Sequence, residues 1–212
     1  MPDRQATFAA VRDERERFAD FLETLTPDQW EGPSLCAGWR VRDVVGHLVY
    51  LAEMRYGRLL TDPFRYRTPL GINRSINAMA IHYGREEPRR LVRRLRASAG
   101  GRFRAPLLPP VTALGEVITH SLDATRPLGI ERQIDPELVV AVLDLYKRIG
   151  PILGARGRVR GLRLVATDIE WSTGMGPDVR GPAASLLLAV AGRPAGLDDL
   201  EGEGLAVLRE RC

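Results

Sequence analysis

Two of the three histidines in this sequence of 212 residues stand where they could bind a metal ion. Glu116 and His120 are four residues apart in a segment expected to be helical, and this spacing places both side chains on one helix face. Asp123 follows three residues later and continues the same polar stripe, opposite the apolar residues of the segment. By itself the stripe predicts either a metal site or an ordinary helix surface that faces water.

His47 lies at the edge of the apolar face of another expected helix. A buried histidine must still satisfy both ring nitrogens, and Asp43, one turn earlier, could accept one N–H. That bond could make His47 a structural residue of the core, or it could orient the ring for metal binding through the other nitrogen. With Glu116 and His120, His47 would complete two imidazoles and one carboxylate. Zinc enzymes use such sets and leave a fourth position open, although other first-row ions accept the same donors.

The remaining reactive side chains are expected to be structural. His82 stands near a helix end and is expected to be structural or exposed. Cys36 lies in a loop bounded by glycine and proline, where a buried structural thiol is favoured over a nucleophile. With Cys212, it makes only two cysteines, which do not form a disulfide framework. No nucleotide-binding loop or serine-hydrolase elbow occurs in the sequence.

The net charge of +4 comes almost wholly from arginine, because Lys147 is the only lysine. The densest run of arginines covers 89–104, with one aromatic residue among them. A solvated helix face is the favoured interpretation and an anion or nucleic-acid site is the alternative, so nucleic acid is not the expected partner. No segment has the roughly 20 apolar residues of a membrane helix, and the N-terminus lacks a secretory signal. A cytoplasmic location without membrane contact is therefore expected.

Hydrophobic periodicity predicts a helical region up to about residue 150. Helices are expected over 8–25, 41–60, 73–83, 88–97, 111–126 and 135–149. Thr26 and Asp135, each followed by proline, are predicted N-caps. The expected fold is therefore mainly α, with a metal-binding helical bundle over 1–153.

Residues 154–212 have a different pattern. Residues 154–161 are expected to be a linker or the approach to a strand. Alternation of apolar and polar residues over 162–167 predicts a strand, and a short extended piece is expected at 179–180. An apolar helix over 182–191 and a last helix over 204–211 complete a small α/β lobe.

Three segments carry a family resemblance. The first, WEGPSLCAGWRVRDVVGHLVYL, resembles the N-terminal signature of the mycothiol-dependent maleylpyruvate isomerase family, which belongs to the DinB-like four-helix-bundle group. The second, GEVITHSLDATRPLG, resembles the ligand helix of that family. The third, GLRLVATDIEWSTGMGPDVRGPAASLLLAVAGR, resembles the small sterol-carrier-like lobe that often follows. The resemblance implies a DinB-like four-helix bundle followed by a small α/β lobe.

The resemblance also implies roles for particular residues. His47, Glu116 and His120 fall on the ligand positions for a divalent metal, most often zinc. Asp123 falls on a position implicated in activity, and Arg193 matches an arginine that engages a substrate carboxylate. The sequence departs from the family pattern before the His47 helix, where Arg40 replaces the usual threonine or serine and weakens the expected cap.

The implied activity uses the metal to hold a low-molecular-weight thiol, with mycothiol as the expected one, as its thiolate. In the family reaction the thiolate adds to the cis double bond of maleylpyruvate, the carbon–carbon bond rotates, and elimination gives the trans product. Related members would use the activated thiol for S-transfer. The expected partners are thus a small thiol and a small organic acid. Two alternatives keep the same bundle: a metal-dependent hydrolase that ignores thiols, and a non-enzymatic regulatory or binding protein.

Overall fold

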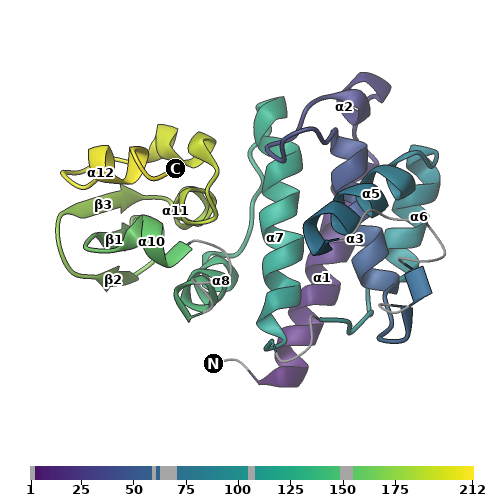
Figure 1. The fold of residues 1–212 in the computed structure, drawn as a ribbon, viewed down its shortest axis with the longest axis horizontal. Helices are drawn as coiled ribbons and strands as arrows, with labels where there is room; N and C mark the ends of the chain where they lie inside the picture. Colours follow the sequence, from purple (N-terminus) through teal and green to yellow (C-terminus); the bar gives the residue numbers. More distant parts are fainter. Residues whose placement is uncertain (1–2, 59–60, 63–70, 105–107, 149–154) are drawn as a thin grey trace. The chain divides into compact units, whose positions relative to one another are not determined.

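The computed structural model describes residues 3–58, 61–62, 71–104, 108–148 and 155–212, which fall into two compact units. The first unit ends at Glu131, and the second covers Arg132–Cys212. Figure 1 shows helices throughout the first unit and a small sheet in the second. The fold is therefore mainly α with a small α/β unit, as the sequence predicts.

The first unit is a helical bundle in which α7 lies alongside α1 and α3, while α5 and α6 pack on α3 (Figure 1). Its helices are α1 (Arg4–Leu22), α2 (Pro27–Glu31), α3 (Val41–Glu53), α5 (Ile72–Gly84), α6 (Pro88–Ala97) and α7 (Val111–Thr125). Buried side chains at helical spacing join these helices into one core, including Phe18, Val45 and Leu95. The core therefore fixes α3 beside α7.

Local signals in the sequence set the starts of two helices. Thr26 forms a capping box with Gln29, whose backbone N–H lies 3.3 Å from Thr26 Oγ1 and whose side chain accepts from Thr26 N at 2.9 Å. At α3 the side chain of the N-cap residue Arg40 makes no capping hydrogen bond to the backbone of the first turn, as the missing threonine predicts, but Asp43 accepts hydrogen bonds from both the backbone and the guanidinium of Arg40. The carboxylate in the first turn also favours the helix N-terminus. The hydrogen bonds between Arg40 and Asp43 therefore stabilise the start of α3.

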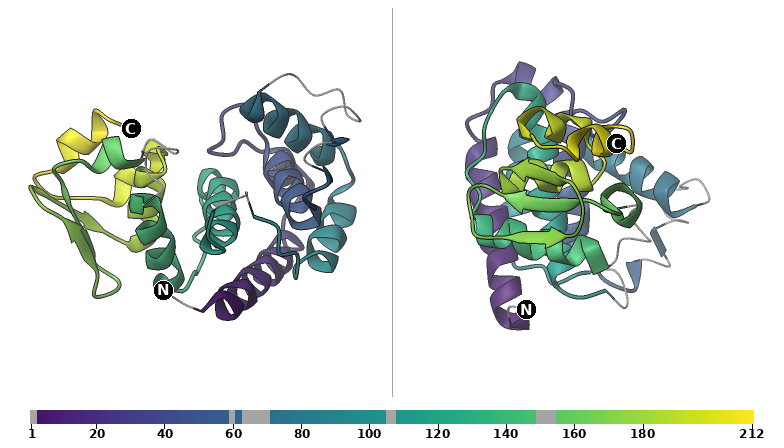
Figure 2. Two further views of the ribbon diagram at one scale, coloured as in Figure 1. Left: turned by 60° about the horizontal axis from the view of Figure 1, so that its bottom comes forward. Right: turned by 90° about the vertical axis from the view of Figure 1, so that its left-hand side faces the viewer.

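The second unit packs a three-stranded sheet against helices, and Figure 2 shows the strands lying against α11. Its elements are α8 (Pro136–Arg148), α10 (Ala155–Val159), β1 (Arg163–Ala166), β2 (Ser172–Gly174), β3 (Asp178–Gly181), α11 (Ala183–Val190), the 3-10 turn η2 (Pro194–Asp199) and α12 (Leu205–Arg209). The strand order is β2-β1-β3, with Leu164 paired antiparallel to Thr173 and parallel to Val179. Alternate strand residues, including Leu164 and Val179, are buried.

Two sequence expectations differ from the structure, and a third stays a prediction. The expected domain boundary at 153/154 lies outside the described residues and stays a prediction, while compact packing groups α8 with α11 in the second unit, which begins at Arg132. Residues 155–159 form the helix α10, not an approach to a strand. The helix expected to reach residue 60 ends at Glu53, since Met54 takes an extended conformation.

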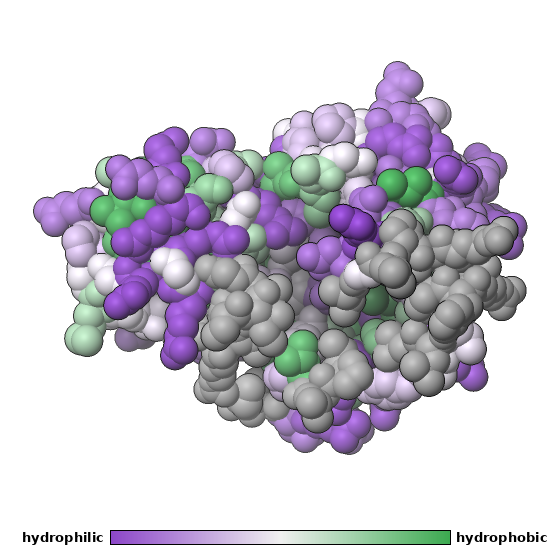
Figure 3. Space-filling model, viewed as in Figure 1, coloured by the Kyte–Doolittle hydropathy of each residue, from purple (hydrophilic) through white to green (hydrophobic). Residues whose placement is uncertain are grey.

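The surface of the described residues is largely hydrophilic. Figure 3 shows polar side chains over most of the visible face, with apolar ones in small separate patches. Several arginines of the 89–104 run are paired with carboxylates: Arg94 contacts Glu53 and Glu86, and Arg96 contacts Asp20 and Glu23. These pairs support the interpretation of the run as a helix face. Among the described residues, no helix combines the length and apolar character needed to cross a membrane.

Candidate metal centre

The predicted ligands come together where α3 meets α7. Nε2 of His47 lies 3.4 Å from Oε2 of Glu116, and Nε2 of His120 lies 3.3 Å from the same oxygen. The two imidazole rings meet edge to face, with centroids 4.8 Å apart. One ligand atom from each residue lies within 4.8 Å of the other two. The structure therefore brings together, from two helices, the set that the sequence suggested.

Exposure differs among the three side chains in a way that gives the cluster an open side. The side chain of His47 is 5% exposed and that of His120 is 14% exposed, whereas Glu116 is 45% exposed. Solvent therefore reaches the cluster past the carboxylate. An ion held by these three residues would keep a position for water or a substrate group, which distinguishes catalytic from closed structural zinc sites.

Asp123 fixes the orientation of His120. Its Oδ2 lies 2.9 Å from Nδ1 of His120, and its side chain is fully buried. When Nδ1 donates its proton to the carboxylate, Nε2 is the ring nitrogen that faces Glu116 and would be the one to bind an ion. Carboxylate–histidine pairs of this kind hold metal-ligating rings and raise their basicity. Asp123 is thus placed beside the cluster through His120, as a positioning residue.

Cys36 also reaches this group, which the sequence interpretation did not anticipate. Its Sγ lies 3.1 Å from Oδ2 of Asp123 and 3.6 Å from Nδ1 of His120. The loop is tied to α7 by a hydrogen bond of 2.9 Å from Leu35 N to Asp123 O. Its place in the LCAGW segment directly before the His47 helix was the available signal. The contact itself could not be predicted from local patterns, because Cys36 and His120 are 84 residues apart in the sequence.

Trp39 lies against both histidines. The centroid of its indole is 5.3 Å from the ring of His47 and 6.1 Å from that of His120. The indole Nε1 donates a hydrogen bond of 2.6 Å to Oδ1 of Asn77 on α5. Trp39 therefore covers one side of the cluster with an apolar surface and limits the approach of water there.

The charges of the cluster are set by burial and by hydrogen bonds. Burial lowers the pKa of His47 by more than the bond to Glu116 raises it, which favours the neutral ring. Burial also acts to lower the pKa of His120, but hydrogen bonds with Asp123, Cys36 and Glu116 outweigh it and raise that pKa well above its usual value. Partial burial acts to raise the pKa of Glu116, yet the two histidines lower it below its usual range.

A buried arginine on α1 also affects the charge of Glu116. Arg15 donates hydrogen bonds from Nη1 to Ala99 O at 2.9 Å and to Gly101 O at 2.7 Å. Burial lowers its pKa to about 10, and the negative charge of Glu116 acts to raise it. Arg15 thus helps to hold the loop after α6 against α1, and it favours the ionised form of Glu116.

The donor set fits a divalent transition-metal ion. Two imidazole nitrogens and one carboxylate oxygen suit zinc and neighbouring first-row ions, and the separations suit ligands that share one ion. The ring of His47 is not held by Asp43, because that carboxylate is engaged by Arg40. Nδ1 of His47 is buried without a hydrogen-bond partner among the described residues. The hydrogen bond between His47 and Asp43 that helical spacing suggested is therefore absent among the described residues.

The other predicted residues lie elsewhere in the described chain. Arg193 belongs to the second unit, where its Nη1 donates to Ala191 O at 2.7 Å. His82 is exposed near the end of α5. Cys212 also lies in the second unit, where its Sγ contacts Ala189 O at 3.3 Å.

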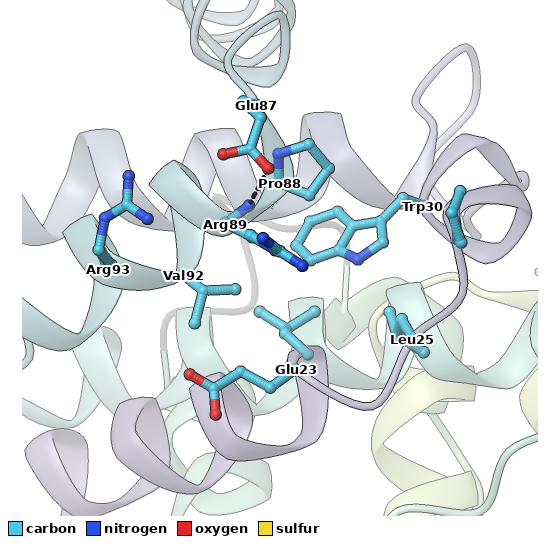
Figure 4. Close-up of a pocket in the computed structure, with 10 residues that line it drawn as sticks. Glu23, Leu25, Trp30, Glu87, Pro88, Arg89, Val92 and Arg93 are labelled. Carbon is cyan, nitrogen blue, oxygen red and sulfur yellow. Dashed lines mark hydrogen bonds between the residues drawn. The ribbon is translucent and has the colours of Figure 1, made fainter.

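A separate hollow of about 650 Å³ lies in the first unit between the end of α1, α2 and the start of α6 (Figure 4). Trp30 and Arg89 lie along its wall in Figure 4, together with the carboxylate of Glu87. The residues that line it include none of the candidate metal ligands. Glu87 also caps α6 by accepting from Arg89 N and Arg90 N. The hollow is therefore a feature of helix packing distinct from the cluster.

Comparison with known proteins points to the family that the sequence resembles. Residues 11–110 match the sequence profile of the mycothiol maleylpyruvate isomerase N-terminal domain. The chain is similar in structure to mycothiol-dependent maleylpyruvate isomerase and to a histidine-to-alanine mutant of that enzyme, with TM-scores of 0.62 and 0.61. Each match has 16% identity and covers 95% of this chain and 93% of the other. Two uncharacterized proteins from two strains of Mycobacterium tuberculosis are 27% identical over 155 residues, covering 68% of this chain and 80% of theirs.

The fold and the cluster define a helical-bundle protein with a centre of two histidines and one carboxylate. Over residues 11–110 its N-terminal unit is similar to the mycothiol maleylpyruvate isomerase N-terminal domain. The matched residues include His47 and end before α7, so the second half of the ligand set is supplied by the geometry. The sterol-carrier-like character of the second unit stays a prediction.

Proposed function

We propose that this protein is a metal-dependent enzyme that activates a low-molecular-weight thiol, with mycothiol as the natural thiol, for isomerisation or S-transfer on a small organic acid. The observation that carries the proposal is the convergence of His47, His120 and Glu116, with Nδ1 of His120 held by Asp123. The family of the N-terminal unit supports the thiol. Zinc is the proposed ion.

In this proposal His47, Glu116 and His120 hold the ion. A bound zinc-type ion lowers the pKa of a coordinated thiol and keeps it as the nucleophilic thiolate. Asp123 holds the ring of His120 in the tautomer that presents Nε2 to the ion. Trp39 excludes water from one side of the site, and the exposed edge of Glu116 marks the side from which thiol and acid enter.

Two residues are proposed to act on the organic acid. Asp123, beside His120, is proposed as the group that handles a proton during the reaction. Arg193 is proposed to bind the substrate carboxylate, since a guanidinium pairs with a carboxylate through two parallel hydrogen bonds. A cytoplasmic location is also proposed, because a free thiol cosubstrate requires a reducing compartment.

The experiment compares the zinc-loaded protein with and without mycothiol. Maleylpyruvate is the probe for isomerisation, and monochlorobimane is the probe for S-transfer. The proposal expects at least one of the two reactions to require both mycothiol and zinc, and to be lost in His47→Ala but kept in His82→Ala. If neither reaction occurs in the zinc-loaded protein, or if turnover is the same without thiol, the proposal is contradicted.

A hydrolase on the same bundle is separated by the same assay. It would use a bound hydroxide and would act on ester probes without any thiol. Esterase activity that depends on His47 and is unchanged by mycothiol would identify this alternative. A protein that binds no metal would instead favour the regulatory or binding alternative.

A further inference from the structure

The ring of His120 faces donor atoms on both of its nitrogens. Nε2 faces the cluster with His47 and Glu116, whereas Nδ1 faces Cys36 and Asp123. On the Nδ1 side, three atoms of different chemistry meet: a thiol sulfur, a carboxylate oxygen and an imidazole nitrogen. They form a second group whose ligand atoms lie within 4.8 Å of one another.

The spacing of the second group is within a few tenths of an ångström of that of ligands around one ion. The separations are 3.1 Å from Cys36 Sγ to Asp123 Oδ2, 3.6 Å from Cys36 Sγ to His120 Nδ1, and 2.9 Å from that nitrogen to the carboxylate oxygen. A tetrahedral zinc with Zn–S near 2.3 Å and Zn–N or Zn–O near 2.0–2.2 Å places its ligand atoms roughly 3.3–3.6 Å apart. Shifts of a few tenths of an ångström would therefore admit the ion.

The second group is held in place by the fold. Asp123 is fully buried on α7, and its backbone oxygen accepts from Leu35 N, which ties the Cys36 loop to the helix. Ser34 fixes the same loop, because its hydroxyl donates to Trp39 O at 2.9 Å and accepts from Cys36 N at 3.1 Å. Cys36 itself is half-buried rather than enclosed in the core.

We propose a second cation position on the Nδ1 side of His120, formed by Cys36, Asp123 and His120 and selective for a thiophilic divalent ion such as zinc. Filling it after the first position displaces two protons, one from the Cys36 thiol and one from Nδ1 of His120. The ring then bridges the two ions as an imidazolate. A thiolate in the ligand set favours soft and borderline ions over magnesium or calcium. The proposal rests on these residues and does not depend on the thiol chemistry of the first position.

Cobalt(II) titration of the reduced, metal-free protein tests this position, because cobalt replaces zinc and reports on sulfur ligation. Wild type is expected to bind a second equivalent of cobalt, with a near-ultraviolet thiolate-to-cobalt charge-transfer absorption. Cys36→Ser should lose that absorption and keep the first equivalent, while Cys212→Ser should keep both. His47→Ala should lose the first equivalent and retain the absorption.

Two results would overturn the second position. One is a wild type saturated with cobalt that shows no thiolate absorption. The other is an absorption that persists undiminished in Cys36→Ser. Because His47→Ala disables only the first position, loss of mycothiol-dependent turnover in that variant with retention of the absorption would separate the two proposals. Circular dichroism of each variant reports whether the helical unit is intact.

Discussion

Two buried helices, α7 in the first unit and α11 in the second, are built for different purposes. α11 is apolar, and its one buried polar side chain, Ser185, is bonded to Asp199 at 2.6 Å. α7 is equally buried but carries four buried polar residues: Thr119, Ser121, Asp123 and Thr125. The contrast indicates that α11 serves packing, whereas α7 accepts the cost of buried polar groups in order to present a site.

The buried polar groups of α7 carry a free-energy cost. Taking an unpaired carboxylate out of water costs several kcal/mol, and the cost is offset only when hydrogen bonds or opposite charge replace the water. Asp123 obtains this compensation from His120 and Cys36. In α11 each buried leucine or valine side chain instead contributes about 1.5–3 kcal/mol through burial alone. Changes in the two helices should therefore separate metal binding from stability.

The largest effect is expected from His120→Ala. Removing a direct ligand should lower zinc affinity by more than the roughly 10- to 100-fold that loss of an outer partner costs. The fold should survive, because the apolar core lies on other helix faces. Competition with a chromophoric chelator measures the affinity, and His82→Ala is the control. A His120→Ala protein that retains full zinc affinity would remove this residue from the site.

Leu186→Ala in α11 is expected to give the opposite outcome. Leu186 has no exposed surface, and deleting a buried leucine side chain typically costs about 2–5 kcal/mol. Chemical denaturation followed by far-ultraviolet circular dichroism should show that loss, while the folded variant keeps wild-type zinc affinity. Reduced zinc affinity in the folded variant would contradict the division of roles between the helices.

Asp123→Asn tests the support given to His120. The amide keeps the shape of the side chain but loses its charge, so zinc affinity should fall by about 10- to 100-fold. Ser121→Ala is the matched control on the same helix, because its hydroxyl donates back to Ile118 O at 2.8 Å within α7. Isothermal titration with zinc measures both variants. Equal affinities in the two would show that Asp123 does not orient the ligand.

The smallest effect on zinc affinity is expected from replacing a glycine, and a second glycine provides a matched control. A Cβ at Gly46 would lie 2.5 Å from Gly84 N, where α3 crosses α5, and a Cβ at Gly196 would lie 2.6 Å from Ser185 O. Each glycine-to-alanine change should cost roughly 1–3 kcal/mol of stability through overpacking. Only Gly46→Ala should also weaken zinc binding, since it displaces the adjacent His47. Equal zinc affinities in the two variants would mean that the position of α3 is not critical.

Much of the fold follows from local sequence signals. The prolines after Thr26 and Asp135 mark helix starts that the structure confirms, and Asp135 Oδ1 accepts from Glu137 N at 2.9 Å. The allocation of α8 to the second unit depends instead on packing with α11. Periodicity shows that a helix has an apolar face but not which neighbour covers it, so this boundary could not be predicted.

The candidate site could be predicted from the sequence only in part, for the same reason. Spacing on α7 brings Glu116 and His120 to one face, and the resemblance adds His47. The contact of Cys36 with Asp123 spans 87 residues, and no local pattern encodes it. Asp43 was a plausible partner for His47 by helical spacing, yet Arg40 competes for its carboxylate. Competition between nearby groups becomes visible only once the side chains are placed.

The central claim is that His47, Glu116 and His120 hold a metal ion. Elemental analysis of untagged protein, purified without chelators, tests it most directly when wild type is compared with His47→Ala. The account predicts that the wild type carries at least one equivalent of zinc or a related ion, and that His47→Ala carries one equivalent less. A wild type that binds no metal even after reconstitution with zinc would contradict the account and leave these three residues as a structural cluster.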